Sequence, residues 1–491
     1  MKSGHYIFIV CIFACWINTY ALQASSPKVL TLSRAIKLAA DSSLASIKAK
    51  NVYLSGYWQF RTFKAGRLPS LKLATTPLEY DRSFVKRYDS ENDIDVYKTQ
   101  QTLYSSANLT LSQNVDITGG TLYVETELDY LRNIGVNVSE QYSSVPFSVG
   151  YSQSLFGYNS FKWDKRIEPV HYEKVKKELL LNIEEISEQV TEYFFSLALY
   201  RKIYDLACQN VANSDSMYQI GSERYKIGSI SNSDLLTLRL DVVNTKIAIK
   251  EAEANLKESS FNLASYLQMD PQTQFDLILP TQPLDISISV EEALRWAREN
   301  NPTIPELKEN NLTAQQTLDQ TKKGNRFSAS VSANVGFNQV ASNFMDAYRK
   351  PLQQDVLSVS LSVPLLDWGV GKGKVNMAKK NLTAVNITSK QAELSFEQDV
   401  LMAVNNFNNR QSQLSLQQEA KEIATQAYEK AKQLFMVGKT DVNTVNSALS
   451  RQIEAESSYI TALKNYWIGY YKIRELTLFD FEKKRPISVE Y

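Results

Sequence analysis

The stretch Leu357-Ser-Val-Ser-Leu-Ser-Val-Pro-Leu365 alternates apolar with small polar residues and leads directly into a long helical segment. Phe147-Ser-Val-Gly-Tyr-Ser-Gln-Ser-Leu155 shows the same pattern in the first half of the chain. A period of two is typical of a strand with one apolar face. Leu155 and Leu365 lie 210 positions apart (365 − 155 = 210), as do Gly228 and Gly438 (438 − 228 = 210). The sequence therefore contains a duplicated unit that joins a strand to a long helix.

The helical segments are unusually long. Residues 374–437 include neither Gly nor Pro and would extend roughly 95 Å at 1.5 Å per residue. Residues 170–227 include only Gly221 and would extend roughly 85 Å, and 229–270 again lack both residue types. Ordinary globular helices have roughly 8–20 residues. The sequence predicts helices well beyond that range.

Apolar residues in these helices recur every seven positions, in two stripes. One set in the first half is Leu235, Val242, Ile249, Leu256 and Leu263, and the other is Leu240, Ile247, Ala254 and Phe261. The second half repeats the spacing at Ile387, Leu394 and Leu401, and at Val400, Phe407 and Leu414. Stripes about 140° apart suit a helix with neighbours on both sides, as in a closed ring. A solid antiparallel bundle is the alternative.

Tight reversals between the long helices are duplicated at 224–236 and 434–445. Gly228 and Gly438 can adopt the left-handed conformation that ends a helix. Ser231 and Asp441 are then the predicted N-caps of the returning helices.

The two halves differ upstream of the junction strands. Residues 288–302 open the second half with a capping-box pattern at Ser289 and Glu292, and 32–40 are its counterpart. Ala35 and Ala293 lie 258 positions apart (293 − 35 = 258), so the first half holds 48 more residues (258 − 210 = 48). A loop at 81–102 and additional strands around it are the predicted source. The expected organisation is a signal peptide at 1–24, a first repeat at 25–270, a linker at 271–287, a second repeat at 288–480 and a C-terminal tail at 481–491.

Composition narrows the class of protein. The formal net charge of +1 gives no reason to expect nucleic acid as a partner. Lys2 and the apolar stretch 6–17 predict a secretory signal, with lipidation at Cys15 as an alternative. No later apolar run is long enough for a membrane helix, so we expect strands if the chain spans a membrane. Cys208 then has no partner for an internal disulfide.

Strand signals lie between the opening helix and the long helices of each half. They cover 327–337 and 357–365 in the second half, and 71–78, 108–117, 122–131 and 147–156 in the first. A half-buried strand of a soluble sandwich shows the same alternation, so a single strand does not distinguish the two.

No motif indicates an enzyme, and we expect no catalytic, cofactor-binding or metal-ligating residues. A Gly-rich phosphate loop, a Cys/His cluster and a nucleophile motif are all missing from the sequence. Glu184, Glu185 and Glu188 are interpreted as a solvated helix face. His171 is the one histidine left after signal removal, and it lies in a charged helical stretch.

Four marks together resemble a known family. They are the opening at 288–302, the strand-to-helix junction at 361–369 with its counterpart at 150–157, and the reversals Tyr225-x-x-Gly228 and Phe435-x-x-Gly438. In this order and spacing the chain resembles the TolC-like outer membrane efflux proteins, the outer membrane factors of tripartite efflux and type I secretion systems.

The resemblance implies an α+β membrane protein of two structural repeats per subunit. A homotrimer would form a 12-stranded β-barrel in the outer membrane lipid, continuous with a periplasmic α-helical barrel. It would be a passive duct of a Gram-negative bacterium, opened by a periplasmic adaptor and an inner-membrane RND or ABC transporter. An exported structural or adhesive coiled-coil protein without channel activity is the alternative.

The resemblance also places the periplasmic entrance and adaptor-docking tips at the helix reversals, at Gly228, Ser231, Asp234, Gly438, Asp441, Thr444 and Ser447. Many relatives carry acidic residues where this chain has Thr444 and Ser447. We expect two barrel strands from each half, including 147–156, with the surplus strands forming external loops or an insert near the mouth.

Overall fold

The computed structural model describes residues 28–134, 138–280 and 286–488, and the expected signal peptide at 1–24 lies outside them. The described residues form two compact units, one of 28–44, 189–280 and 413–465, and the other of 45–134, 138–188, 286–412 and 466–488. Helices and strands are both abundant, as expected for an α+β protein. Among the described residues, none of the helices combines the length and the apolar character needed to span a bilayer.

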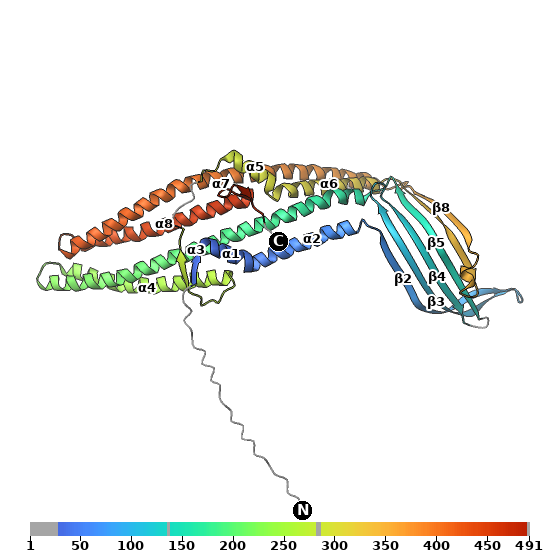
Figure 1. Ribbon diagram of the computed structural model, residues 1–491, viewed down its shortest axis with the longest axis horizontal. Helices are drawn as coiled ribbons and strands as arrows, with labels where there is room; N and C mark the ends of the chain where they lie inside the picture. Colours follow the sequence, from blue (N-terminus) through green and yellow to red (C-terminus); the bar gives the residue numbers. More distant parts are fainter. Residues whose placement is uncertain (1–27, 135–137, 281–285, 489–491) are drawn as a thin grey trace, which may run out of the picture. The chain divides into compact units, whose positions relative to one another are not determined.

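The helices occur as pairs of nearly equal length (Figure 1). The longest are α3 (Ser160–Lys226) and α7 (Val370–Met436), of 67 residues each. The returning helices α4 (Asn232–Tyr266) and α8 (Val442–Thr477) have 35 and 36 residues. The shorter pairs are α1 (Leu32–Ser42) with α5 (Val290–Asn300), and α2 (Leu44–Ala65) with α6 (Thr303–Gly324).

The sequence spacings reappear in the helix starts. α3 and α7 begin 210 residues apart (370 − 160 = 210), and α1 and α5 begin 258 residues apart (290 − 32 = 258). Each 67-residue helix reaches about 100 Å at 1.5 Å per residue. Pro169 lies inside α3 and does not end it.

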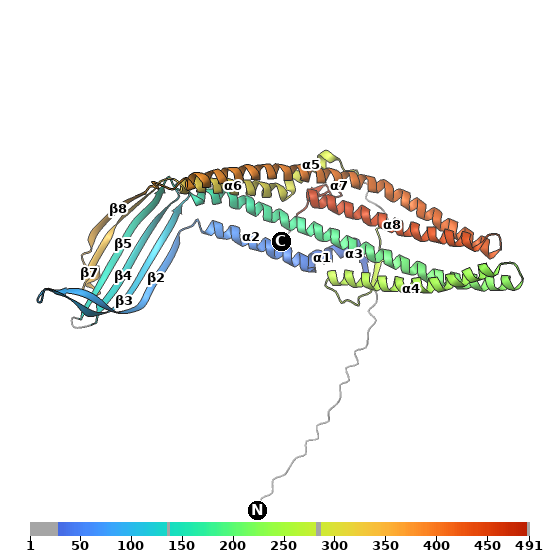
Figure 2. The same ribbon diagram turned by 180° about the vertical axis from the view of Figure 1, so that it is seen from behind.

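Six strands form one antiparallel sheet in the order β2-β3-β4-β5-β7-β8 (Figures 1 and 2). They are β2 (Ser70–Asp89), β3 (Ile94–Val115), β4 (Gly120–Asn133), β5 (Ser139–Leu155), β7 (Ser328–Ala341) and β8 (Leu352–Ser362). β5 lies between β4 and β7, so the two halves of the sequence meet inside the sheet.

The part of the sheet nearest the helices has one apolar and one polar face, because the register preserves alternation there; beyond it, register shifts occur after Thr76, Glu125 and Ser144. Leu111 pairs with Val124, Val124 with Val149, and Val149 with Val335. On the other face Tyr123 pairs with Gly150, and Gly150 with Asn334.

The expectation of two barrel strands from each half stays a prediction, but the surplus segments of the first half are strands of the same sheet rather than external loops. Four strands come from the first half and two from the second. The expected loop at 81–102 is instead the distal part of the β2–β3 hairpin, with Asp81 paired with Thr102 and Asp89 with Ile94. The surplus segments carry the same alternation as their neighbours, so they extend the sheet and satisfy backbone hydrogen bonds that a loop would leave to water.

The segments expected to be a linker and a tail also contain strands. β6 (Phe275–Ile278), within the linker, pairs in parallel with β1 (Lys28–Thr31) in the first unit. In the second unit β9 (Phe479–Asp480) pairs with β10 (Arg485–Pro486), so residues expected in the tail form a hairpin with the end of the second repeat. A one-turn helix, η1 (Asp346–Tyr348), lies between β7 and β8.

Candidate functional site

The two reversals between long helices have the same backbone geometry. Gly228 and Gly438 adopt φ of 72° and 78°, where a residue with a Cβ is strained. The N–H of Gly228 donates to the Tyr225 carbonyl, and the N–H of Ser229 to the Arg224 carbonyl. Gly438 and Lys439 repeat these two bonds, which form a Schellman motif at each reversal. Sequence reasoning therefore located both helix ends correctly.

The returning helices begin at the predicted caps. The Ser231 hydroxyl accepts from the Asp234 N–H at 3.1 Å, and Asp234 Oδ2 accepts from the Ser231 N–H at 3.1 Å. At the second reversal, Asp441 Oδ1 accepts from the Thr444 N–H at 2.8 Å. That backbone hydrogen bond lowers the pKa of Asp441 and keeps it ionised. The carboxylates of Asp234 and Asp441 are thus both engaged in capping.

Arg224 connects the two reversals, a contact that the sequence analysis missed. Its Nη2 donates to the carbonyl oxygens of Phe435 at 2.9 Å and Met436 at 3.2 Å, and its guanidinium lies 5.2 Å from the Phe435 ring centroid. These carbonyls lack partners inside α7, and a cation at a helix C-terminus is favourable. The only sequence signal for this contact is an Arg in the last turn of α3, and it does not identify the carbonyl groups that Arg224 binds.

Beneath the reversals, the four helices share a small core. Its buried residues are Leu238, Tyr428, Ala431, Phe435, Val442 and Val445. Two polar bonds lie beside it, from Asn213 to the Tyr428 hydroxyl (2.9 Å) and from Asn446 to Asp241 (2.8 Å). Gly221 packs so closely on Leu238 that an added Cβ would overlap the leucine Cδ1. This end of the four helices is therefore a packed unit rather than frayed ends.

Thr444 and Ser447 lie on an exposed face of α8. With Asp441 they border an open groove of about 850 Å³, which alanines of α7 line on the other side (Ala420, Ala424, Ala427 and Ala431). The Thr444 hydroxyl also donates to Asp441. The seven predicted residues thus occupy the two reversals and the first two turns of the returning helices.

The heptad stripes differ in burial. On α4, Leu263 is buried and Leu235, Val242, Ile249 and Leu256 are half-buried, whereas Leu240 and Ile247 are 58% and 53% exposed. On α7, Val400 and Phe407 are buried and Ile387 and Leu394 are exposed. α4 and α7 therefore each pack one apolar stripe within the chain and present another outward. The apolar face of the sheet is also exposed, at Leu71, Leu73, Val335, Leu357 and Val359.

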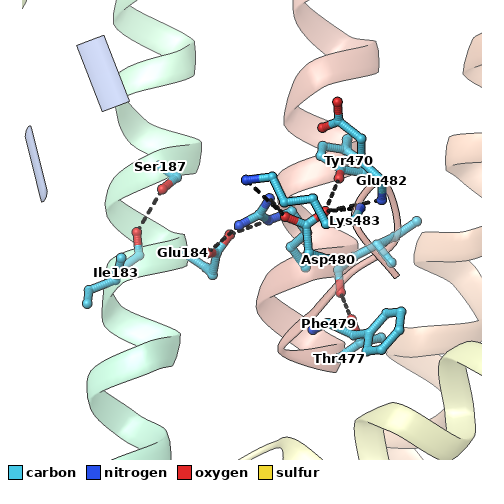
Figure 3. Close-up of polar contacts among 11 residues, drawn as sticks. Ile183, Glu184, Ser187, Tyr470, Thr477, Phe479, Asp480, Glu482 and Lys483 are labelled. Carbon is cyan, nitrogen blue, oxygen red and sulfur yellow. Dashed lines mark hydrogen bonds and ion pairs between the residues drawn. The ribbon is translucent and has the colours of Figure 1, made fainter. Parts of the chain in front are cut away.

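A buried ion cluster holds the end of α8 against α3 (Figure 3). Arg474 binds Glu184 through two hydrogen bonds, at 2.8 and 2.9 Å, and Asp480 at 3.1 Å. The interpretation of Glu184 as solvated is wrong, since its side chain is buried and only 2% of the residue is exposed. Periodicity placed Glu184 on the helix but gave no sign of a cation 290 residues away. Glu185 is exposed, as expected.

The charges around this cluster have shifted pKa values. Burial raises the pKa of Glu188 to about 7, and a hydrogen bond with Glu475 adds to the shift. Burial opposes ionisation of Asp480, but the Lys483 N–H and Arg474 hold the pKa of its carboxyl below the usual value.

His171 Nδ1 lies 2.8 Å from Glu309, which also binds Lys174 at 3.1 Å, so this histidine takes part in helix packing.

Residues 293–477 match the sequence model of the family described as outer membrane efflux protein. Curated protein sequences give no match. Among solved structures, the fold is similar to the CmeC outer membrane channel of Campylobacter jejuni, with 13% identity, a TM-score of 0.66, and coverage of 94% of this chain and 87% of that one.

Two further channels are similar. The open state of the MtrE outer membrane channel of Neisseria gonorrhoeae has 13% identity and a TM-score of 0.60, over 91% of this chain and 88% of that one. The outer membrane protein VceC of Vibrio cholerae has 13% identity and a TM-score of 0.59, over 91% and 95%. These likenesses establish the fold, and the family match covers the second half of the chain. The second half of the chain therefore carries the sequence pattern of the outer membrane efflux protein family, and the whole chain shares the fold of these outer membrane channels.

Proposed function

We propose that this protein is a passive duct of a tripartite efflux or type I secretion system, and that it acts as a homotrimer without enzymatic chemistry. The observation that carries the proposal is the set of apolar surfaces left exposed on one copy: a second seam on α4 and α7, and apolar residues on one face of the sheet. A chain with such surfaces gains stability when copies and lipid cover them.

The helices would form the periplasmic wall. A helix with one buried and one exposed seam has room for a neighbour on each side, and repetition of that contact around an axis closes a hollow ring. The paired lengths of α3 with α7 and α4 with α8 support two similar wall segments per subunit. Three subunits would then give the tunnel a pseudo-sixfold character.

The reversals would form the periplasmic entrance. Gly228, Ser231, Asp234, Gly438, Asp441, Thr444 and Ser447 lie at the tips of the helical hairpins, where a periplasmic adaptor would dock and an inner-membrane RND or ABC transporter would deliver cargo. Thr444 and Ser447 carry no charge, and Asp441 is engaged in capping. The entrance therefore offers no free carboxylate ring at these positions for a cation.

Outer membrane fractionation followed by planar-bilayer recording tests the proposal. The duct should be extracted by detergent as a trimer and should conduct once reconstituted. Efflux of a dye from cells should also require the adaptor and transporter that co-purify with the protein after crosslinking. An exported coiled-coil rod would instead stay soluble, and a folded trimer that never conducts, even with its adaptor, would refute the duct.

A further inference from the structure

The six-stranded sheet has two strands with only one neighbour each. β2 pairs with β3 and β8 pairs with β7, and all 11 residues of β8 are exposed. In a bilayer every backbone N–H and C=O must find a partner within the protein, so lipid-exposed sheet edges do not occur there. Six strands are also fewer than the eight of the smallest known single-chain outer membrane barrels. Both edges must therefore be covered by another chain.

A second copy of this chain fits both edges. The six strands alternate in direction, so β2 and β8 run in opposite directions and can pair as antiparallel neighbours between copies. β2 follows α2 and β8 precedes α7 with short connections, so both strands meet helices at the same end of the sheet. Pairing β8 with β2 of the next copy would continue the alternation around a closed wall.

Side-chain alternation determines which residues of β8 and β2 can be neighbours in this pairing. Leu71 and Leu73 of β2 lie on the apolar face, since they pair with Leu111 and Leu109. Leu357 and Val359 of β8 lie on the same face, since they pair with Ala333 and Val331. A shift of one residue would place leucines among the serines of the polar face, so odd-numbered residues of the two strands must be neighbours.

We propose that β8 of one copy pairs with β2 of the next, so that each copy supplies six strands to the barrel. This rests on the proposed trimeric duct, for which the barrel then has 18 strands (3 × 6 = 18). Barrel diameter grows roughly linearly with strand number, which makes this mouth about 1.5 times as wide as a 12-stranded one. Barrels of 16–18 strands leave a broad aqueous channel. The duct would thus widen toward the outside and pass bulkier cargo.

A four-strand contribution is the competing arrangement, with β2 and β3 outside the wall and β4 at the edge. It requires β4 to exchange its partner, because every residue of β4 from Gly120 to Asn133 pairs with β3 without a register shift. The apolar row also continues from Val124 through Leu111 to Leu71. The observed ladder therefore favours six strands.

Cysteine crosslinking between copies distinguishes the two arrangements. In a C208A background, one cysteine replaces Lys72, Ala74 or Thr76 on the polar face of β2, and a second replaces Ser358, Ser360 or Ser362 of β8. These strands lie at opposite edges of one sheet, so any disulfide joins two copies. At least one of the nine pairs should give a covalently linked trimer on a denaturing gel, and reductant should return it to monomer.

Two matched sets complete the experiment. In the first set, Leu73→Cys is combined with the same β8 cysteines. Leu73 lies on the opposite face of the sheet, so these pairs should not crosslink. Thr121→Cys or Tyr123→Cys of β4 should also fail, because β3 and β5 already flank that strand. Each single-cysteine variant must first be recovered as a trimer.

A conducting trimer that crosslinks through β4, or through neither strand, overturns the six-strand barrel while leaving the duct intact. A protein that is monomeric and does not conduct refutes the proposed function itself.

Discussion

The guanidinium of Arg224 caps the end of a helix that is not its own, with its Nη2 2.9 Å from the Phe435 carbonyl oxygen. The two residues lie 211 positions apart and belong to the tips of two different helical hairpins. A single side chain thus fastens together the reversals that we place at the periplasmic entrance.

Arg224→Ala should loosen the two tips. A hydrogen bond of this kind contributes about 1 kcal/mol. Its loss removes the Arg224 donor from the Met436 carbonyl and leaves the Phe435 carbonyl with the Gly438 N–H alone. We expect faster amide hydrogen exchange at residues 430–445 and a higher resting conductance of the reconstituted channel. Lys226→Ala is the control, because Lys226 is exposed and its ion pair is with Glu223 of the same turn. Equal exchange in the two variants would contradict a connecting role for Arg224.

Glu184→Ala should strongly destabilise the second unit. It leaves the buried Arg474 with only part of its charge compensated, and breaking a buried ion pair typically costs about 3–5 kcal/mol. Glu185→Ala on the exposed neighbouring position should have little effect. Thermal unfolding of the detergent-extracted proteins measures the difference. Similar midpoints for the two variants would show that the pair contributes no net stability.

The raised pKa of Glu188 predicts that the free energy of unfolding falls as pH rises. Its pKa of about 7 lies above its ordinary value, because of burial first and then its contacts with Glu475 and Glu185, against the opposing charge of Lys472. A raised pKa stabilises the fold while the carboxyl is protonated, and this contribution is lost as pH increases through about 7. The unfolding midpoint should therefore drop between pH 5 and pH 8, and less so in Glu188→Gln. Parallel pH profiles for the two proteins would refute the assignment.

Ile247→Asp should break the proposed contact between copies. Ile247 lies on the exposed seam of α4, where a charge would be desolvated in the trimer but solvated in the monomer. We expect at least a tenfold shift toward monomer, corresponding to about 1.4 kcal/mol. Asn255→Asp adds the same charge at an exposed position outside both stripes and should leave the trimer intact. Native mass spectrometry reports both populations, and an unchanged trimer in Ile247→Asp would place the interface elsewhere.

Local patterns were sufficient where the structure depends on neighbouring residues. Residues within a few turns account for the capping by Ser231 and Asp441 and for the positive φ of Gly228 and Gly438. They also account for the length of α7. The 48 surplus residues were also counted correctly and additional strands were expected among them, but 81–102 was expected to be a loop, whereas it belongs to the β2–β3 hairpin of the sheet.

By itself, the sequence determined the kinds of element, their lengths, their order and the positions of the reversals, because helix and strand periods and end signals act over short distances. Tertiary structure decided which partners those elements have. A strand inside the sheet and one in an outer hairpin alternate in the same way, so only pairing placed β2 and β3. Glu184 meets Arg474, and Arg224 meets Phe435, across more than two hundred residues. The physical reason is that burial and capping depend on what folds alongside a side chain, which its neighbours in sequence do not encode.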